Sequence, residues 1–172
     1  MVRIFVDMDG TIAKWCPDGA DRLYDEHYFS SLPVMQQMTQ AVNRLVEISP
    51  QYDLEVYSLS AVLKDSPYAE KEKNMWLDRH TIIKNRIFVP NGADKTEYVP
   101  RGIKKYDFLL DDYSKNLHEW RVKENAIKVL NGINNTKHTW KGNKISSRNS
   151  PEQIVERILS ICLCGQTVTE EY

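Results

Sequence analysis

Two features that would place a protein in a membrane or a secretory route are missing from this sequence of 172 residues. Mainly apolar runs such as 108–110 and 158–163 fall far short of the roughly 20 residues that a membrane-spanning helix needs. The N-terminus reaches an acidic residue at Asp7, without the apolar centre and small-residue cleavage site of a secretory signal. We therefore expect a cytoplasmic protein.

Cysteine is scarce, and neither sign of charge dominates. Cys16, Cys162 and Cys164 form an odd set without a pair of CxxC motifs, which indicates reduced thiols rather than a disulfide framework or a zinc site. The 23 Lys+Arg and 24 Asp+Glu residues give a formal net charge of -1, so no global basic field exists to drive binding to nucleic acid or membrane surfaces. With 41% hydrophobic residues, the composition predicts one globular domain over residues 1–172.

A basic cluster and the four histidines are both interpreted as structural or solvent-exposed residues rather than as binding sites. A basic cluster around Trp140 could contact a polyanion, but a solvated basic loop is favoured; its members are Lys137, Lys141, Lys144 and Arg148. The histidines have no metal-liganding spacing and are expected at the surface or in packing; they are His27, His80, His118 and His138.

Short apolar runs alternate with amphipathic segments along the chain. Strands are predicted over residues 2–6, 53–60, 86–89, 106–110 and 126–130. Helices are predicted over residues 33–48, 67–79 and 114–122, with Pro33 in the first turn of the first and Ser114 capping the third, and a last helix starts near 150–153 and reaches Cys162.

The strands predict how these elements are arranged. Their apolar runs are largely continuous rather than alternating, which is typical of strands buried on both faces of a parallel sheet. We expect an α/β fold of the Rossmann-like, three-layer type, with a mostly parallel sheet and helices on both faces. Residues 13–32 fit this pattern poorly and are predicted to be a small insertion over the sheet edge.

Acidic residues follow two of the predicted strands. Asp7 and Asp9 come after the first strand, and Asp111 and Asp112 follow the fourth. Ligands of open parallel sheets bind at the carboxyl ends of the strands, so these four side chains are expected to converge. Their mutual repulsion calls for a cation, and Mg²⁺ prefers such hard oxygen ligands. Each pair alone could be an ordinary turn, but two pairs after two strands favour a site.

These residues resemble a known family. The segment 7–11, Asp-Met-Asp-Gly-Thr after an apolar strand, resembles the DxDGT signature of the haloacid dehalogenase-like (HAD) phosphohydrolases. The family has three further motif positions, and the residues that resemble them, in order, are Ser60, Lys95 and the pair Asp111-Asp112. Within the superfamily the sequence is most similar to the 5'(3')-deoxyribonucleotidase family of cytosolic type, on the wording of three segments: Leu109 to Asn116, Asp94 to Thr96 and Ser66 to Tyr68.

The resemblance implies an activity and a ligand set. It implies a HAD-like fold with a small cap at residues 13–32, and a magnesium-dependent phosphomonoesterase that acts on nucleoside monophosphates, preferably deoxy. It also implies that the backbone carbonyl of Asp9, not its side chain, completes the metal shell beside Asp7. Asp112 would then be the direct ligand of the acidic pair, while Asp111 orients a water molecule or Lys95. Exchanging the two roles would not alter the mechanism.

The chemistry of the first two acids can be argued from the groups themselves. A carboxylate accepts a phosphoryl group when a metal and cations shield the repulsion between them, so Asp7, first after the strand, is the predicted nucleophile of an aspartyl-phosphate mechanism. Asp9 lies two residues further on and is predicted to protonate the leaving oxygen and later to take a proton from water. Gly10 suits a backbone that turns sharply beside a ligand.

Two more catalytic positions have rivals nearby. Ser60 is predicted to donate its hydroxyl to a phosphate oxygen, and it is favoured over Ser58 because it follows the whole apolar strand. Lys95 is predicted to neutralise charge on the nucleophile and the transferring phosphoryl group. Lys104 and Lys105 are its competitors, because the gap from Lys95 to the acidic pair is long for the family pattern.

Other hypotheses remain open at this point. The aromatic residues of 13–32 could stack on a base, although packing within a small core is favoured. So short a cap leaves room for other substrates, including another small phosphometabolite or a terminal phosphate of a nucleic acid. A phosphate-binding module without turnover is disfavoured, because a binder has no need of Asp9. The expected partner is a small phosphomonoester, and binding to a membrane or to nucleic acid is not expected.

Overall fold

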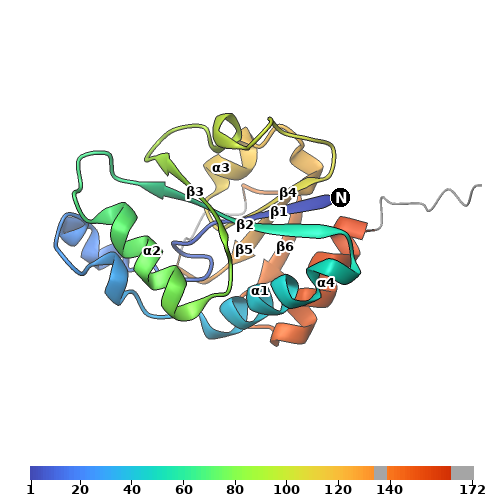
Figure 1. Ribbon diagram of the computed structural model, residues 1–172, viewed down its shortest axis with the longest axis horizontal. Helices are drawn as coiled ribbons and strands as arrows, with labels where there is room; N and C mark the ends of the chain where they lie inside the picture. The colour runs from blue at the N-terminus through green and yellow to red at the C-terminus, as the bar shows by residue number, and fades with distance from the viewer. Residues whose placement is uncertain (134–138, 164–172) are drawn as a thin grey trace, which may run out of the picture.

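A computed structural model, described here for residues 1–133 and 139–163, contains a six-stranded sheet in the order β3-β2-β1-β4-β5-β6. Every pair of neighbouring strands in it is parallel, which confirms the predicted α/β architecture (Figure 1). The strands are β1 (Val2–Val6), β2 (Leu54–Val62), β3 (Asn85–Pro90), β4 (Asp107–Asp111), β5 (Ala126–Leu130) and β6 (Asn143–Ser146).

Helices cover the two faces of the sheet unequally (Figure 1). The α-helices are α1 (Gln36–Ile48), α2 (Ala69–His80), α3 (Ser114–Glu119) and α4 (Pro151–Leu163). The 3-10 turns are η1 (Pro17–Arg22), η2 (Phe29–Ser31), η3 (Ser49–Gln51), η4 (Lys95–Tyr98) and η5 (Lys123–Asn125). Apolar residues of α1, α2 and α4 join one large core, whereas α3 contributes to a smaller core that also contains Trp120 and Trp140.

The central strand shows how one sequence serves both cores. Ile4 of β1 lies in the large core and the adjacent Phe5 lies in the small one, since successive side chains of a strand point to opposite faces. Phe5 stacks on Tyr57 with ring centroids 4.9 Å apart. Because β1 is buried on both faces, its carboxyl end lies at the centre of the molecule, where Asp7 follows it.

Five of the six strands match the predicted positions to within two residues, and the sixth contradicts a prediction. Residues 143–146 form the edge strand β6 rather than a loop, because they pair with β5 and bury Ile145, while Lys141, Lys144 and Arg148 are exposed to solvent as expected. Trp140 is buried too, with its ring 5.1 Å from that of His118, so it is not available to a polyanion. Three residues of the predictions lie outside the described part of the chain: Lys137, His138 and Cys164.

The helix ends also correct some predictions. The first helix begins at Gln36 rather than Pro33, because the preceding residues run beside the insertion: Lys14 donates its N–H to the Pro33 carbonyl at 2.7 Å. α3 stops at Glu119, and Ser114 does not cap it: the Ser114 hydroxyl accepts a hydrogen bond from Lys128 at 3.0 Å.

The predicted start of the last helix is confirmed. Ser150 donates its N–H to the side chain of Gln153, and the Gln153 N–H returns a bond to the Ser150 hydroxyl. These reciprocal bonds satisfy two backbone donors that a helix N-terminus would otherwise expose to water.

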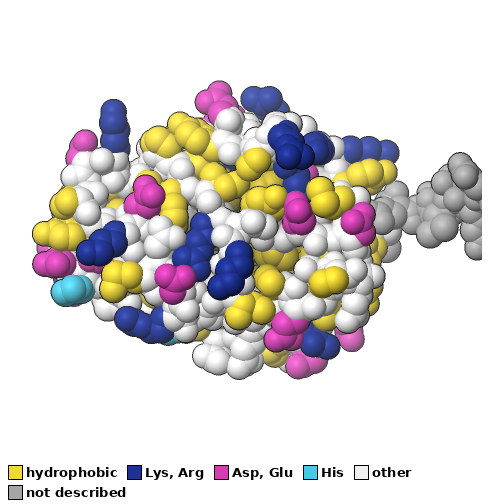
Figure 2. Space-filling model, viewed as in Figure 1, with side chains coloured by type: hydrophobic (Ala, Val, Ile, Leu, Met, Phe, Trp, Pro, Cys, Tyr) yellow, Lys and Arg dark blue, Asp and Glu magenta, His cyan; other side chains and the backbone are white. Residues whose placement is uncertain are grey.

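The insertion at 13–32 packs against α2. Tyr28 and Phe29 are buried in the large core, in line with the favoured interpretation, while Tyr24 is exposed. The face of the molecule in Figure 2 carries interspersed side chains of both charges, as a net charge near zero would give. Within residues 1–133 and 139–163, no helix has the length and apolar character to cross a membrane.

Candidate active site

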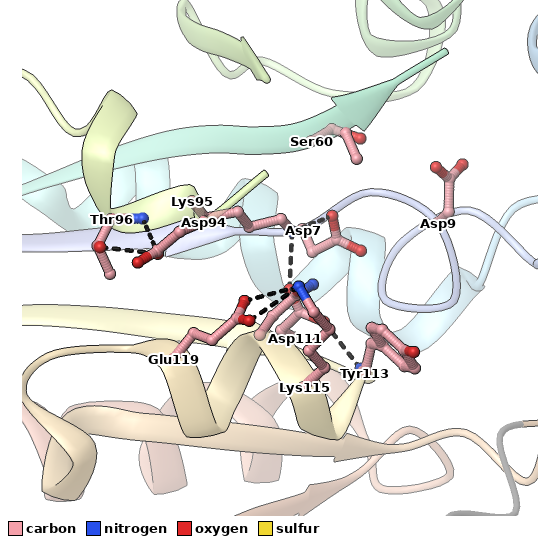
Figure 3. A network of polar contacts seen from close by, with 12 residues as sticks. Asp7, Asp9, Ser60, Asp94, Lys95, Thr96, Asp111, Tyr113, Lys115 and Glu119 are labelled. Atoms are coloured by element: carbon pink, nitrogen blue, oxygen red, sulfur yellow. Dashed lines mark hydrogen bonds and ion pairs between the residues drawn. The ribbon is translucent and has the colours of Figure 1, made fainter. Parts of the chain in front are cut away.

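The carboxyl ends of β1 and β4 bring three aspartates together. Asp7 follows β1 and donates its backbone N–H to the Leu110 carbonyl at 2.9 Å, so it lies beside Asp111, the last residue of β4. One carboxylate oxygen from each of Asp7, Asp111 and Asp112 lies within 4.8 Å of the others, and all three residues are buried. Side chains far apart in sequence therefore meet, and Figure 3 shows Asp7 beside Asp111.

Lys95 contacts both Asp7, the predicted nucleophile, and Asp111 at the end of β4. We call these three residues the Lys95 cluster. The Lys95 Nζ lies 2.6 Å from Asp7 Oδ1 and 2.7 Å from Asp111 Oδ2. The turn η4 holds the lysine there, since Asp94 accepts bonds from the N–H and the hydroxyl of Thr96 (Figure 3). The rivals Lys104 and Lys105 are exposed before β4, at the opposite end of that strand.

Burial and crowding shift the ionisation of these groups. Burial raises the pKa of Asp7 to about 7, with the charges of Asp111 and Asp9 adding to the shift and that of Lys95 opposing it. Burial, followed by the charges of Asp111 and Asp7, raises the pKa of Asp112 well above its usual value. Burial alone would lower the pKa of Lys95, but the charges of Asp111 and Asp7 outweigh it and raise that pKa. The site thus holds more negative charge than one lysine neutralises.

The same residues fit a hard divalent cation. Three buried carboxylates lie close together here, and carboxylate oxygens are ligands that Mg²⁺ prefers. Gly10 has φ +78°, and a Cβ added there would collide with the carboxylate of Asp112, so a glycine lets this loop close around the acids. Asn131 donates to Asp112 Oδ2 at 2.8 Å and to the Gly10 carbonyl at 2.8 Å, which ties the two loops together.

The two members of the acidic pair have different surroundings. Asp111 accepts the Tyr113 N–H on Oδ1, and on Oδ2 it accepts Lys95 and the amide of Asn116 at 2.8 Å. Both of its oxygens are therefore already committed to donors. This arrangement fits a role for Asp111 in orienting Lys95.

The side chain of Asp9 points away from the other acids (Figure 3). It forms an ion pair with Lys73, and it is not part of the carboxylate group around Asp7. Lys73 also donates to Ser60 Oγ at 3.0 Å, so these three residues make a second set, the Lys73 cluster. The arrangement agrees with metal contact through the backbone of Asp9, while its carboxylate is held on the side of the insertion.

Ser60 lies within β2, not beyond it, because the strand continues to Val62. Its side chain nevertheless reaches the site, whereas the Ser58 hydroxyl is buried and has no hydrogen-bond partner among the described residues. The strand continues because Ala61 and Val62 pair with β3, an edge that the local sequence does not reveal.

Sequence reasoning missed two buried lysines. Lys73 lies on the core-facing side of α2, one turn before Trp76 and Leu77, and Lys128 lies inside the apolar strand β5. Lys128 donates to the Asp112 carbonyl at 2.7 Å, which fixes the backbone that carries this acid. A charged residue at a position where periodicity expects an apolar one was the available signal for both.

Two adjoining cavities open beside these clusters. The larger, of about 570 Å³, reaches from Asp7 and Asp9 past Gly92 to Lys115. The smaller, of about 250 Å³, has a more apolar wall that includes Phe29 and Leu63. Asp9 and Trp15 line both cavities, so Asp9 stands where a phosphate in one could join a leaving group in the other.

The sequence matches the profile of a family described as "5' nucleotidase, deoxy (Pyrimidine), cytosolic type C protein" over residues 12–160. No curated protein matches it significantly.

Solved structures with a similar fold include a phosphatase. The D,D-heptose 1,7-bisphosphate phosphatase from Burkholderia thailandensis has a TM-score of 0.61 at 11% identity, covering 93% of this chain and 99% of that one. The HAD domain of the effector protein Lem4 from Legionella pneumophila has a TM-score of 0.54 at 14% identity, covering 94% and 95%. A chain of the Pnkp1/Rnl/Hen1 complex has a TM-score of 0.53 at 16% identity, covering 74% and 45%.

Proposed function

Because the chain belongs to the family of cytosolic type C deoxy 5'-nucleotidases and has the fold of HAD phosphatases, we propose that it is a magnesium-dependent phosphomonoesterase for deoxyribonucleoside monophosphates. The observation that carries the proposal is the Lys95 cluster beside Asp112, where Asp7, Lys95 and Asp112 line a cavity of about 570 Å³. The family description also supports a cytosolic location.

We assign the attack on phosphorus to Asp7. Lys95 bonds its Oδ1, so Oδ2 is the oxygen assigned to form the bond to phosphorus while the bond to the leaving oxygen breaks. Asp9 gives a proton to the leaving oxygen and later removes one from the water that attacks the aspartyl phosphate. The Ser60 hydroxyl accepts from Lys73, so its own proton is available for a phosphate oxygen.

A cation would be held by Asp7, Asp112 and the carbonyl of Asp9, and when bound it would supply positive charge against the phosphate and these carboxylates. Within the chain, Lys95 supplies positive charge to Asp7 directly. Asp111 holds that lysine in place, and Asn116 donates to the same oxygen of Asp111.

The substrate class rests on the family and on the shape of the site. The aromatic wall formed by Trp15 and Phe29 would accept a nucleoside beside Asp9. The open larger cavity would also admit a longer molecule, so a terminal phosphate of a nucleic acid is the second candidate. We propose residues 13–32 as the cap that separates the two classes.

A panel of substrates tests this function. Phosphate release would be measured with Mg²⁺ on 5'- and 3'-monophosphates of ribo- and deoxyribonucleosides, on sugar phosphates and on a 3'-phosphorylated oligonucleotide. We expect deoxyribonucleoside monophosphates to give the highest kcat/KM, and Asp7→Asn to lose at least about 10³-fold while remaining folded. Binding of Mg²⁺ and phosphate without turnover on any substrate would instead make the protein a binding module.

A further inference from the structure

Lys73 has more partners than a lysine needs for packing. It is 1% exposed, and its Nζ contacts Asp9 Oδ2, Ser60 Oγ at 3.0 Å and the Ala61 carbonyl at 2.5 Å. An ammonium has three N–H donors and no acceptor, so these three oxygens use all of them. The position of the charge is therefore fixed by β2 and by Asp9.

The two oxygens of Asp9 are not equivalent. Oδ2 faces the Lys73 ammonium, whereas Oδ1 is buried without a hydrogen-bond partner among the described residues. A buried oxygen without a partner costs stability, and Asp9 lines both cavities. Because Lys73 can only donate, a proton carried by Asp9 has its place on Oδ1.

The helix turn that carries Lys73 also holds the insertion. The Lys73 Nζ lies 4.8 Å from the centre of the Phe29 ring, an attractive cation–π contact. The neighbouring Glu72 accepts backbone N–H bonds from His27, Phe29 and Ser30, at 2.5, 3.0 and 3.3 Å. Two consecutive residues of α2 thus bind the first-strand loop and the segment that covers it.

Burying a lysine costs free energy that an apolar residue at the same position would not. Lys73 faces the core beside Trp76 and Leu77, where a leucine or methionine would pack. A charge retained at this position, with its ammonium against Asp9, needs a reason other than folding.

We propose that Lys73 is a positioning residue for proton transfer by Asp9. It holds Oδ2, so that Oδ1 faces the leaving oxygen and carries the proton. In the first step the Asp7–phosphorus bond forms, the bond from phosphorus to the leaving oxygen breaks with its electron pair on that oxygen, and the Oδ1 proton moves to it. The inference rests on the proposed function and adds to it the residue that orients the acid.

The dependence of rate on the leaving group tests the inference. Phenyl phosphate and p-nitrophenyl phosphate are similar in size, but nitrophenolate leaves readily without a proton whereas phenolate needs one. We expect Lys73→Met to lower kcat/KM for phenyl phosphate by about 30-fold or more and for p-nitrophenyl phosphate by about 3-fold or less. The ratio of the two values does not depend on how much of the sample is folded.

Three controls separate this role from a structural one. Lys71→Met changes an exposed lysine of the same helix and should leave both rates within about 2-fold of the parent. In an Asp9→Asn background, Lys73→Met should change the phenyl phosphate rate by no more than about 2-fold, because the residue that it positions no longer transfers a proton. Lys73→Gln is measured in the same way, and it replaces Lys73→Met where that variant yields too little folded protein.

Equal losses on both aryl phosphates, or additive losses in the double variant, would overturn the positioning role while leaving the phosphatase proposal intact. An inactive parent protein would overturn the proposed function, and the positioning role with it.

Discussion

The Lys95 cluster and the Lys73 cluster each place a buried lysine against an aspartate of the same loop, but they are built differently. Lys95 bonds two buried carboxylates at the ends of neighbouring central strands. Lys73 comes from a helix and bonds Asp9, whose side chain is 24% exposed, together with a serine hydroxyl. The comparison indicates that the sheet positions Asp7, the proposed nucleophile, whereas a helix positions Asp9, the proposed acid.

The difference also shows in the charge balance. In the Lys95 cluster two carboxylates share one lysine, with Asp112 close by, and the pKa of Asp7 rises to about 7. The Lys73 cluster pairs one carboxylate with one lysine. A divalent cation therefore relieves repulsion in the first cluster and is not needed for charge balance in the second.

The largest expected effect breaks the Lys95 cluster. Lys95→Met should lower kcat/KM by about 10³-fold. The variant loses the positive charge that neutralises the phosphate, and it leaves Asp7 beside Asp111 without the ammonium group between them. Steady-state kinetics on both aryl phosphates measures this. The two losses should be equal, unlike those for Lys73→Met. Lys105→Met, at the other end of β4, is the matched control, and a similar loss there would contradict the assignment of Lys95.

The second prediction uses the unequal charge balance. Since Asp7 has a folded pKa of about 7 against an ordinary value of 3.8, the folded state binds more protons than the unfolded state between these values. The free energy of unfolding contributed by this group therefore falls as pH rises from about 4 to about 7.

Mg²⁺ should reverse that loss where the carboxylates are charged. We expect Mg²⁺ to raise Tm by about 5 °C at pH 8, and by clearly less at pH 5.5, because protons then compete for the same oxygens. Thermal unfolding with and without Mg²⁺ measures the shift. Asp112→Asn should reduce it, and an undiminished shift in that variant would place the metal elsewhere.

The smallest expected effect comes from Glu72, which holds the insertion but does not contact Asp9 in the structure. Glu72→Gln should lower the free energy of unfolding by about 1–2 kcal/mol, because the three backbone N–H groups are divided over both carboxylate oxygens and an amide keeps only one accepting oxygen. Urea unfolding measures this, with Glu70→Gln, an exposed change on the same helix, as the control. The ratio of the two aryl phosphate rates should not change. A changed ratio would show that the contacts between Glu72 and the insertion also affect proton transfer by Asp9.

Much of this architecture could be read from local patterns. The apolar runs predicted five strands and a parallel sheet. The four acids after the first and fourth runs were expected to meet; Asp7, Asp111 and Asp112 do, whereas the Asp9 side chain pairs with Lys73 instead. Lys95 was chosen over two neighbours from its place in a motif, and it alone of the three reaches Asp7. Such predictions succeed because side-chain period and strand ends are local properties of a chain.

Other features had no local signal strong enough to read. β6 forms because β5 offers it a free edge, and Ile145 alone is too short an apolar pattern to predict it. Lys73 and Lys128 interrupt apolar patterns, but this signal does not name a partner: only the packed chain shows which oxygens surround their ammonium groups.

The sequence by itself determined the order of strands and helices, the acidic loops and the family to which the chain belongs. Tertiary structure alone decided which lysine faces which aspartate, and that the side chain of Asp9 turns away from Asp7 toward α2. The physical reason is that spacing along a chain fixes which side of an element a residue occupies, whereas ion pairs between distant residues depend on how the elements pack.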